Sequence, residues 1–421
     1  YLTLTLPAEH RDLPKVICIC VGGLVVQQVR DDVNGYIQAQ MRRTPNLEYQ
    51  VWDGDMMAGF IERHYVSDRL LLNSVSTKLG RCVALPDEVE YFVSNFRELM
   101  DEIFASGSVA RTKDPAFHVV CLNLCLAVLL HHGRDAGNVD AAYRAAEQAQ
   151  LAAWGHLELG NPSCANREHR LQVFDMLWNL YVRIGEIYVA HLAPFLGEPF
   201  RFALSVEGAQ DEVDVNLKAF DVLGRLVSLA VSLDAYGRKQ RETGREPEPA
   251  QTALAVRLGG LVPQMLENVH TLATPMLECQ LSAISMAVAY LLGKRQEASV
   301  RRWVERIAEG LLGRVMMRKG FPTLDVDYEQ LLDHVHDEHD EGYVDKAWPS
   351  IVYLLYLAFK RGWENVVLKL AEVIGLLPKT VLQIWFPGKD AGLHFADGGL
   401  RQCGLMLYGL DMSREGLVRQ I

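Results

Sequence analysis

From about residue 85 onward, apolar side chains recur three or four positions apart, the spacing that places them on one face of an α-helix. The stripe in residues 167–192 consists of Leu171, Phe174, Trp178, Tyr181, Ile184 and Tyr188. The same pattern predicts helices at 139–159, 213–236, 251–270, 276–292, 298–317, 347–361 and 364–376. The tryptophans show no constant interval, so we expect a multi-helix bundle or an irregular α-solenoid rather than a regular repeat array.

Proline marks two expected helix boundaries. Asp114-Pro115 is typical of a helix start, because proline fits the first helical position and aspartate caps the free N–H groups. The helix of residues 167–192 is expected to end before Pro194, which lacks the N–H that a helix interior needs.

The first 65 residues differ from the rest because they contain strand-type runs. Residues 15–21 are continuously apolar or β-branched and end at a Gly-Gly pair, the pattern of a strand buried on both faces. Residues 47–52 form a second strand, with helices expected at 24–41 and 56–64. Short connections between these elements predict a parallel βαβ unit. The fold class is therefore mainly α, with a small N-terminal α/β segment.

Two strands do not make a stable sheet, so we expect partner strands from upstream or from another chain. The chain starts at Tyr1 without a methionine, which agrees with a further upstream segment. A length of 421 residues predicts more than one domain. We expect a partial α/β domain at 1–70, a helical domain at 71–240 and a second helical domain at 250–421. The polar, Gly- and Pro-rich stretch 236–250 is the expected linker.

Composition narrows the environment and the partners. The chain has 42 basic and 53 acidic residues, a net charge of −11 that argues against a broad nucleic-acid-binding surface. The longest apolar runs, 117–130 and 281–292, are shorter than the roughly 20 residues that cross a bilayer, so no membrane segment is expected. Most cysteines lie in apolar runs (Cys18, Cys20, Cys121, Cys125, Cys279), as reduced core thiols of a cytoplasmic protein do.

The most distinctive charged segment is 321–345. It contains nine acids and three histidines but no lysine or arginine. Mixed carboxylate and imidazole ligands suit a divalent metal, and the metal hypothesis places it at His334, His336, His339 and Asp340. The alternative is a solvated charged loop, because this spacing matches no standard metalloenzyme motif.

A second candidate is the loop Trp385-Phe386-Pro387-Gly388-Lys389-Asp390, followed by His394 and Asp397. Lysine, aspartate and histidine on one loop can bind an anion or transfer protons. We favour a plainer interpretation, a turn between two helices whose aromatic pair fills the core.

Three smaller patterns have structural explanations. His131-His132-Gly133 is expected to form the C-terminal cap of an apolar helix. Cys121 and Cys125 lack a second thiol pair, so they are interpreted as core residues and not as metal ligands. A basic face formed by Arg301, Arg302, Arg314, Arg318 and Lys319 is expected to pair with the acidic segment; contact with a phosphate backbone is the alternative.

Known catalytic motifs are missing. The sequence contains no phosphate-binding loop, no Gly-x-Ser-x-Gly elbow, no His-Glu-x-x-His and no Gly-x-Gly-x-x-Gly after a strand. We therefore predict no catalytic residue and no cofactor within this chain, and leave open whether the protein is an enzyme.

One resemblance suggests a biological setting. The strand Ile17-Cys18-Ile19-Cys20-Val21-Gly22-Gly23, the helix containing Gln28–Val33 and the segment Tyr49-Gln50-Val51-Trp52-Asp53-Gly54-Asp55 resemble the closing half of an Mrr-like restriction-endonuclease domain of the PD-(D/E)xK superfamily. The resemblance covers residues 1–65. That family's metal-binding Asp and Glu-x-Lys precede the segment matched here, and residues 1–14 do not contain them. No catalytic residue is carried over, and Mg²⁺ is expected only with an intact nuclease domain upstream.

The resemblance implies a role in bacterial defence against foreign DNA. The leading hypothesis is a helical sensor or assembly region of a defence protein, associated with a nuclease-like domain whose catalytic half is not in this chain. Its partners would be another protein or further copies of the chain, with nucleic acid reached through the nuclease domain. The alternative is a non-enzymatic helical scaffold whose βαβ segment completes a sheet in another subunit.

Overall fold

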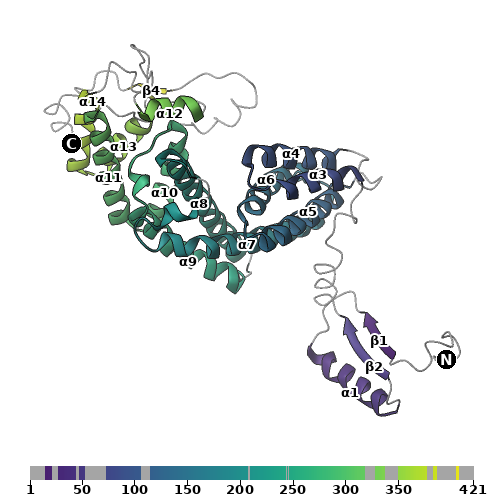
Figure 1. The fold of residues 1–421 in the computed structure, drawn as a ribbon. Helices are drawn as coiled ribbons and strands as arrows, with labels where there is room; N and C mark the ends of the chain where they lie inside the picture. The colour runs from purple at the N-terminus through teal and green to yellow at the C-terminus, as the bar shows by residue number, and fades with distance from the viewer. Residues whose placement is uncertain are drawn as a thin grey trace. The chain divides into compact units, whose positions relative to one another are not determined.

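The computed structural model describes residues 15–20, 27–43, 47–52, 73–105, 114–206, 209–242, 244, 246–317, 328–336, 349–376, 383–385 and 404–406. Helices dominate these residues, and a small parallel strand pair lies near the N-terminus (Figure 1). The predicted fold class, mainly α with a small N-terminal α/β segment, is confirmed. The chain divides into two compact units, Tyr1–Ile184 (unit 1) and Gly185–Ile421 (unit 2).

The N-terminal segment is a parallel βαβ unit, as predicted. Strands β1 (Lys15–Cys20) and β2 (Leu47–Trp52) pair in parallel from Lys15 opposite Leu47 to Cys20 opposite Trp52. Helix α1 (Gln27–Arg43) connects them and contacts β2. The helix predicted at residues 56–64 lies outside the described residues.

The rest of unit 1 consists of packed helices. They are α3 (Asn73–Ala84), α4 (Val89–Phe104), α5 (Pro115–Asp135), α6 (Asp140–His156) and the first half of α7 (Arg167–Leu196). Helices α3 and α4 pack together, α5 packs on α6, and α4 contacts both α5 and α6. Asp114 caps α5 as predicted, because its carboxylate accepts the Ala116 N–H at 3.1 Å.

The predicted end of α7 before Pro194 is wrong, since the helix continues to Leu196. Two contacts hold the last turn despite the missing proline N–H. The Leu196 side chain is fully buried, and Asn268 donates its side-chain N–H to the Leu196 carbonyl at 3.0 Å. Tertiary packing thus overrides the local preference of proline near a helix end.

Among the described helices, α5 alone is long and apolar enough to span a membrane, although the sequence runs were expected to be too short. Of its most apolar 18-residue window, 56% is buried inside the protein. Leu122, Cys125 and Leu126 are completely buried. A core helix of a globular unit passes the same length and composition test, so this feature is weak support for membrane insertion.

Unit 2 contains η4 (Arg201–Ser205), α8 (Glu212–Glu242), α9 (Pro249–Asn268), η5 (His270–Ala273), η6 (Glu278–Gln280), α10 (Leu281–Gly293), α11 (Glu297–Met316), α12 (Tyr328–His336), α13 (Pro349–Lys360) and α14 (Glu364–Leu376). Helix α8 packs on α9 and α10, whereas α14 packs on α11 and α13. A small apolar cluster joins the start of α8 to α12 through Val213, Met276, Leu331 and Val335.

The expected linker at 236–250 is much shorter than predicted. Helix α8 continues to Glu242 and α9 begins at Pro249, and the two helices pack against each other within unit 2. The sequence placed a division between helical domains at 240–250, whereas the compact units meet between Ile184 and Gly185, inside α7. The last turns of α8 expose polar residues to solvent. Exposed polar residues are also typical of linkers, so the sequence pattern did not distinguish the two.

The C-terminal region contains a strand pair that the sequence did not predict. Strands β3 (Gln383–Trp385) and β4 (Gly404–Met406) pair antiparallel, with Trp385 opposite Gly404. Trp385 therefore ends a strand and does not lie in a turn between two helices. The remaining members of that candidate loop, from Phe386 to Asp397, lie outside the described residues.

Candidate functional site

The hypothetical metal site is only partly described. His334 and His336 lie on α12, while the positions of their side chains, and His339 and Asp340 entirely, lie outside the described residues. No group of three or more potential metal ligands occurs among the residues that the structure describes. The metal hypothesis at His334, His336, His339 and Asp340 therefore stays a prediction.

The expected cap at His131-His132-Gly133 is wrong in its details. Helix α5 continues past Gly133 to Asp135, and His131 forms an ion-pair contact with Asp135 at 3.5 Å. Gly133 is buried, and a Cβ there would stand 2.5 Å from the carbonyl oxygen of Asn138. The glycine is needed for this close approach of backbone, and Gly137, with φ of +72°, makes the turn that follows.

Part of the basic face has a partner outside the acidic segment. Arg314 is buried on α11 and pairs with Glu212, the first residue of α8, at 3.5 Å. Burial lowers the pKa of its guanidinium, and Glu212 opposes that shift. Arg301 and Arg302 are exposed, while Arg318 and Lys319 lie outside the described residues. Pairing of this face with the acidic segment 321–345 stays a prediction, because most of that segment lies outside the described residues.

The cysteines follow the core-thiol prediction only in part. Cys125 is buried and burial raises its pKa, while Cys121 is half-buried with a pKa raised for the same reason. Burial also raises the pKa of Cys82 on α3 to about 12. Cys18 and Cys279 are exposed, contrary to expectation. The raised pKa values keep these buried thiols protonated and unreactive.

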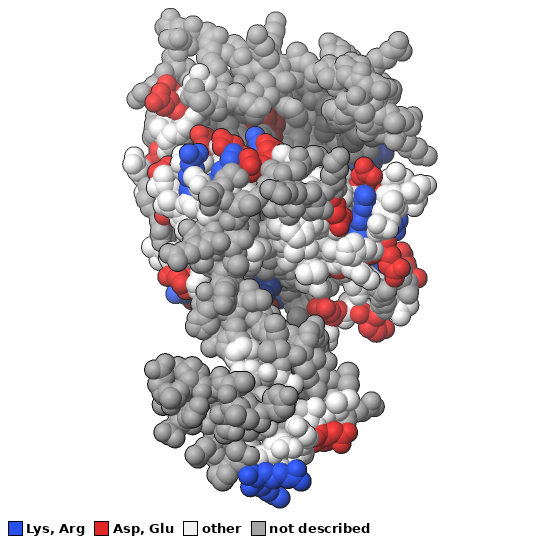
Figure 2. All heavy atoms as spheres, turned by 90° about the vertical axis from the view of Figure 1, so that its right-hand side faces the viewer, with Lys and Arg blue, Asp and Glu red and all other residues white. Residues whose placement is uncertain are grey.

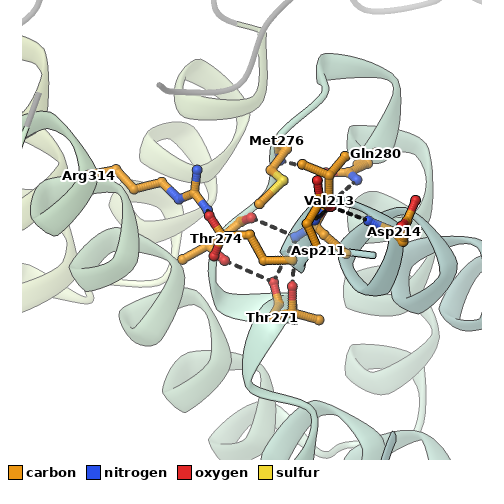
Figure 3. A network of polar contacts seen from close by, with 10 residues as sticks. Asp211, Val213, Asp214, Thr271, Thr274, Met276, Gln280 and Arg314 are labelled. Carbon is orange, nitrogen blue, oxygen red and sulfur yellow. Dashed lines mark hydrogen bonds and ion pairs between the residues drawn. The ribbon is translucent and has the colours of Figure 1, made fainter. Parts of the chain in front are cut away.

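A buried polar network of unit 2 surrounds Asn216 on α8 (Figure 3). The fully buried Asn216 donates to the Thr271 hydroxyl and the Thr274 carbonyl, both at 2.9 Å. Its side-chain carbonyl accepts from Gln280 at 2.8 Å, and the Gln280 carbonyl in turn accepts the Met276 N–H at 2.8 Å. These bonds hold the connection between α9 and α10 (residues 269–280), whose backbone forms only the short 3-10 turns η5 and η6 and no α-helical hydrogen-bond ladder.

Helix α11 holds the same connection from its other side. Trp303 donates its indole N–H to the Leu272 carbonyl at 3.0 Å, and Arg306 donates to the carbonyls of Leu266 and Glu267 at 2.9 Å. Gly310 allows the backbones to touch, because a Cβ there would stand 2.3 Å from the carbonyl oxygen of Ala273. The network and these contacts are structural, since each polar group is used by the fold.

Two further contacts fix later helices to this region. The buried Glu278 carboxylate accepts the N–H and the hydroxyl of Ser350 at 2.9 and 2.8 Å, which anchors the first turn of α13. Tyr328 of α12 donates to Asp214 at 2.7 Å. Desolvation raises the pKa of Asp214, but the hydrogen bonds that its carboxylate accepts, including those from Gln210 and Tyr328, together lower it further. The carboxylate therefore stays ionised.

Unit 1 contains a histidine pair in which His118 is buried and His156 is half-buried. His118 of α5 and His156 at the end of α6 face each other, with Nδ1 and Nε2 3.0 Å apart. The His118 ring is 2% exposed, and the His156 ring stacks on Phe104 of α4 with centroids 4.2 Å apart. Burial lowers the pKa of His156, and His118 and Arg170 add to the shift. The folded protein therefore favours the uncharged form of His156.

A cavity of about 380 Å³ lies between the last turns of α8, the first turns of α9 and the end of α10. We call it the α8–α9–α10 cavity. Its volume is within the range of pockets that hold small molecules. Its polar lining residues are Asp234, Arg241, Gln251, Thr252, Lys294 and Gln296, and its apolar wall includes Leu233, Pro247, Ala255 and Val256.

The α9 wall of this cavity has an interrupted hydrogen-bond ladder. Pro263 lies inside α9 and has no N–H, so the carbonyl of Gly259, four residues earlier, loses its helical donor. Gln296 replaces that donor with its side-chain N–H at 3.2 Å. The hydroxyl of Tyr290 also reaches this wall, 3.7 Å from the Cβ position of Gly259. It is buried and has no hydrogen-bond partner in the part of the chain that the structure describes.

The sequence did not indicate the cavity, because its residues come from three helices and show no motif. The sequence features that could have indicated this cavity are two glycines and one proline: Gly237, Gly259 and Pro263. No family model, curated protein or solved structure matches the chain. Function must therefore be argued from the residues themselves.

Proposed function

We propose that this chain is the helical sensor or assembly region of a bacterial antiviral defence protein, associated with a nuclease-like domain whose catalytic half lies outside it. The nuclease would cleave phosphodiester bonds with Mg²⁺, while the helical units would bind a protein partner or further copies of the chain. A cytoplasmic location follows from this role, because foreign DNA is met there.

The observation that carries the proposal is the incomplete sheet. Strand β1 reads Lys-Val-Ile-Cys-Ile-Cys and pairs on one side with β2. Val16 is 47% exposed and Cys18 is also exposed, although such an apolar strand is typical of a sheet covered on both faces. Among the described residues the sheet has two strands, and a sheet of two strands with an apolar surface is unstable alone, so the proposal expects further strands and a covering layer.

The charge distribution supports helical units that bind protein and a separate nuclease domain that binds DNA. Acidic and basic side chains are interspersed on the face drawn in Figure 2. Many of the basic groups are paired, as Lys369 is with Glu305 and Glu309 and Arg225 is with Asp221. A surface of mixed charge suits protein partners better than a phosphate backbone.

The test is plasmid cleavage by a protein that carries this chain together with the residues encoded upstream of Tyr1. The proposal expects an upstream Asp and Glu-x-Lys on strand-like segments, and cleavage that requires Mg²⁺ and stops with a chelator. An upstream sequence without these residues, together with no cleavage, contradicts the nuclease and leaves the non-enzymatic scaffold.

A pair of variants tests whether β1 is covered in the longer protein. Val16→Lys places a charge where the proposal expects burial, so it is expected to abolish cleavage and lower thermal stability. Tyr36→Lys changes a side chain of α1 that is 57% exposed and serves as the control. Equal, small effects of both variants would show that β1 remains uncovered.

A further inference from the structure

We propose that the α8–α9–α10 cavity binds a small organic anion, with the guanidinium of Arg241 as the group that receives its carboxylate or phosphate. The cavity lies entirely within unit 2, and its argument does not depend on the nuclease association. The proposal rests on the charges of the cavity lining, the position of Arg241 and the polar groups of the wall.

The charges of the lining leave one cation unpaired. Lys294 of α10 forms an ion pair with Asp234 of α8, with Nζ 2.7 Å from a carboxylate oxygen. The side chain of Arg241 has no ion pair or hydrogen bond among the residues that the structure describes, although its backbone carbonyl accepts the Gly244 N–H at 3.0 Å. The lining therefore carries two cations and one anion, and a ligand with one negative charge neutralises it.

Arg241 bends back over the cavity. One of its terminal nitrogens lies 3.9 Å from the Cβ position of Gly237, one turn earlier on α8. Pro247 lies 3.7 Å from the same position. Both distances are ordinary van der Waals contacts, so the guanidinium lies along Gly237 at the cavity, where its planar N–H groups can hold a carboxylate or phosphate by two hydrogen bonds.

The opposite wall supplies neutral polar groups. Gln296 uses its N–H on the Gly259 carbonyl, which leaves its own carbonyl oxygen available as an acceptor. The buried Tyr290 hydroxyl lies behind this wall, 3.7 Å from the Cβ position of Gly259, and is not part of the cavity lining; burial with the nearby Asp234 raises its pKa to about 12, so it stays protonated. Leu233, Ala255 and Val256 offer apolar contact to the body of the ligand.

The experiment measures the melting temperature of the full chain with 10 mM inorganic phosphate or 10 mM succinate, against sodium chloride at the same ionic strength. A site with a dissociation constant near 1 mM raises the melting temperature by about 3 °C. The two anions separate a phosphate ligand from a carboxylate ligand. No rise with either anion contradicts the proposal.

Two arginine variants on one helix make the result specific. Arg241→Gln is expected to reduce the rise to less than a third. Arg238→Gln changes an exposed arginine of α8 outside the cavity lining and is expected to retain the rise. Equal loss in both variants would assign the effect to general charge and overturn the site. Because no DNA is present, failure here is distinct from failure of the nuclease proposal.

Discussion

The two units bury polar groups in different ways. In unit 1, like side chains on neighbouring helices bond each other: His118 to His156 at 3.0 Å, and the hydroxyls of Tyr143 and Tyr181 at 3.1 Å. In unit 2, Asn216 bonds groups of the connection between α9 and α10, including the Thr274 carbonyl at 2.9 Å. The polar bonds of unit 1 thus join one helix to another. Those of unit 2 hold the connection between α9 and α10, which has only short 3-10 turns, inside the core.

This difference predicts different sensitivities. A connection that has only short 3-10 turns depends on the side chains that satisfy its remaining backbone groups, so unit 2 should respond strongly to steric and amide changes. A pair of histidines responds to protons, so the stability of unit 1 should depend on pH. Four changes to the protein or its solution test this difference between the units.

Gly310→Ala should have the largest effect. The new methyl group would stand 2.3 Å from the Ala273 carbonyl oxygen, a backbone atom that cannot move aside cheaply. We expect a loss of about 3 kcal/mol in the free energy of unfolding, measured by urea denaturation. Gly313→Ala, on the same helix with nothing within 4 Å of its Cβ position, should be neutral or raise stability by up to about 1 kcal/mol. Equal effects would refute close packing of the connection on α11.

Asn216→Ala should come next. It removes the donor for Thr271 and Thr274 and the acceptor for Gln280, all in a buried site, so we expect a loss of about 2–3 kcal/mol. Asn95→Ala is the control from unit 1, because buried Asn95 donates only to the Tyr91 carbonyl of its own helix at 2.7 Å. A loss of about 1 kcal/mol or less is expected there. A larger loss for Asn95 would contradict the comparison.

Lowering the pH should destabilise unit 1. Burial, His118 and Arg170 lower the folded-state pKa of His156, and Glu158 only partly opposes them. The unfolded chain therefore binds protons more readily, and stability present above about pH 6.5 is lost as the pH falls toward the lowered folded value. Denaturation curves between pH 7.5 and pH 5 measure this loss. His156→Gln should flatten the dependence, and an unchanged slope in that variant would exclude the pair as its source.

The smallest effect is expected for Tyr290→Phe. Its hydroxyl has no partner among the described residues, so its removal should change the free energy of unfolding by less than about 0.5 kcal/mol. Tyr143→Phe removes a hydroxyl bonded to Tyr181 and should cost about 1 kcal/mol. A large loss for Tyr290 would reveal a partner that the cavity argument excludes.

Elements with local signals were predicted well from the sequence. The strands at 15–20 and 47–52 agree with their apolar runs, and Asp114-Pro115 begins α5 as capping rules require. Periodicity located α14 at the same bounds, Glu364–Leu376. In these segments the side-chain spacing itself determines the structure.

Features that depend on distant residues were missed. Pro194 lies inside α7 because Asn268, 72 positions away, bonds the end of that helix. The network around Asn216 joins residues 55 to 64 positions apart, and nothing near Asn216 in sequence indicates its partners. Helix α3 was also missed, because its buried residues Val75, Leu79 and Cys82 form too short a stripe to stand out.

We propose above that β1 belongs to a larger sheet. Amide hydrogen exchange of Lys15–Cys20, compared between this chain and the protein that includes the upstream residues, tests it directly. The account predicts that the β1 amides directed away from β2 exchange rapidly in this chain and become strongly protected in the longer protein. Equal exchange in both proteins would contradict it.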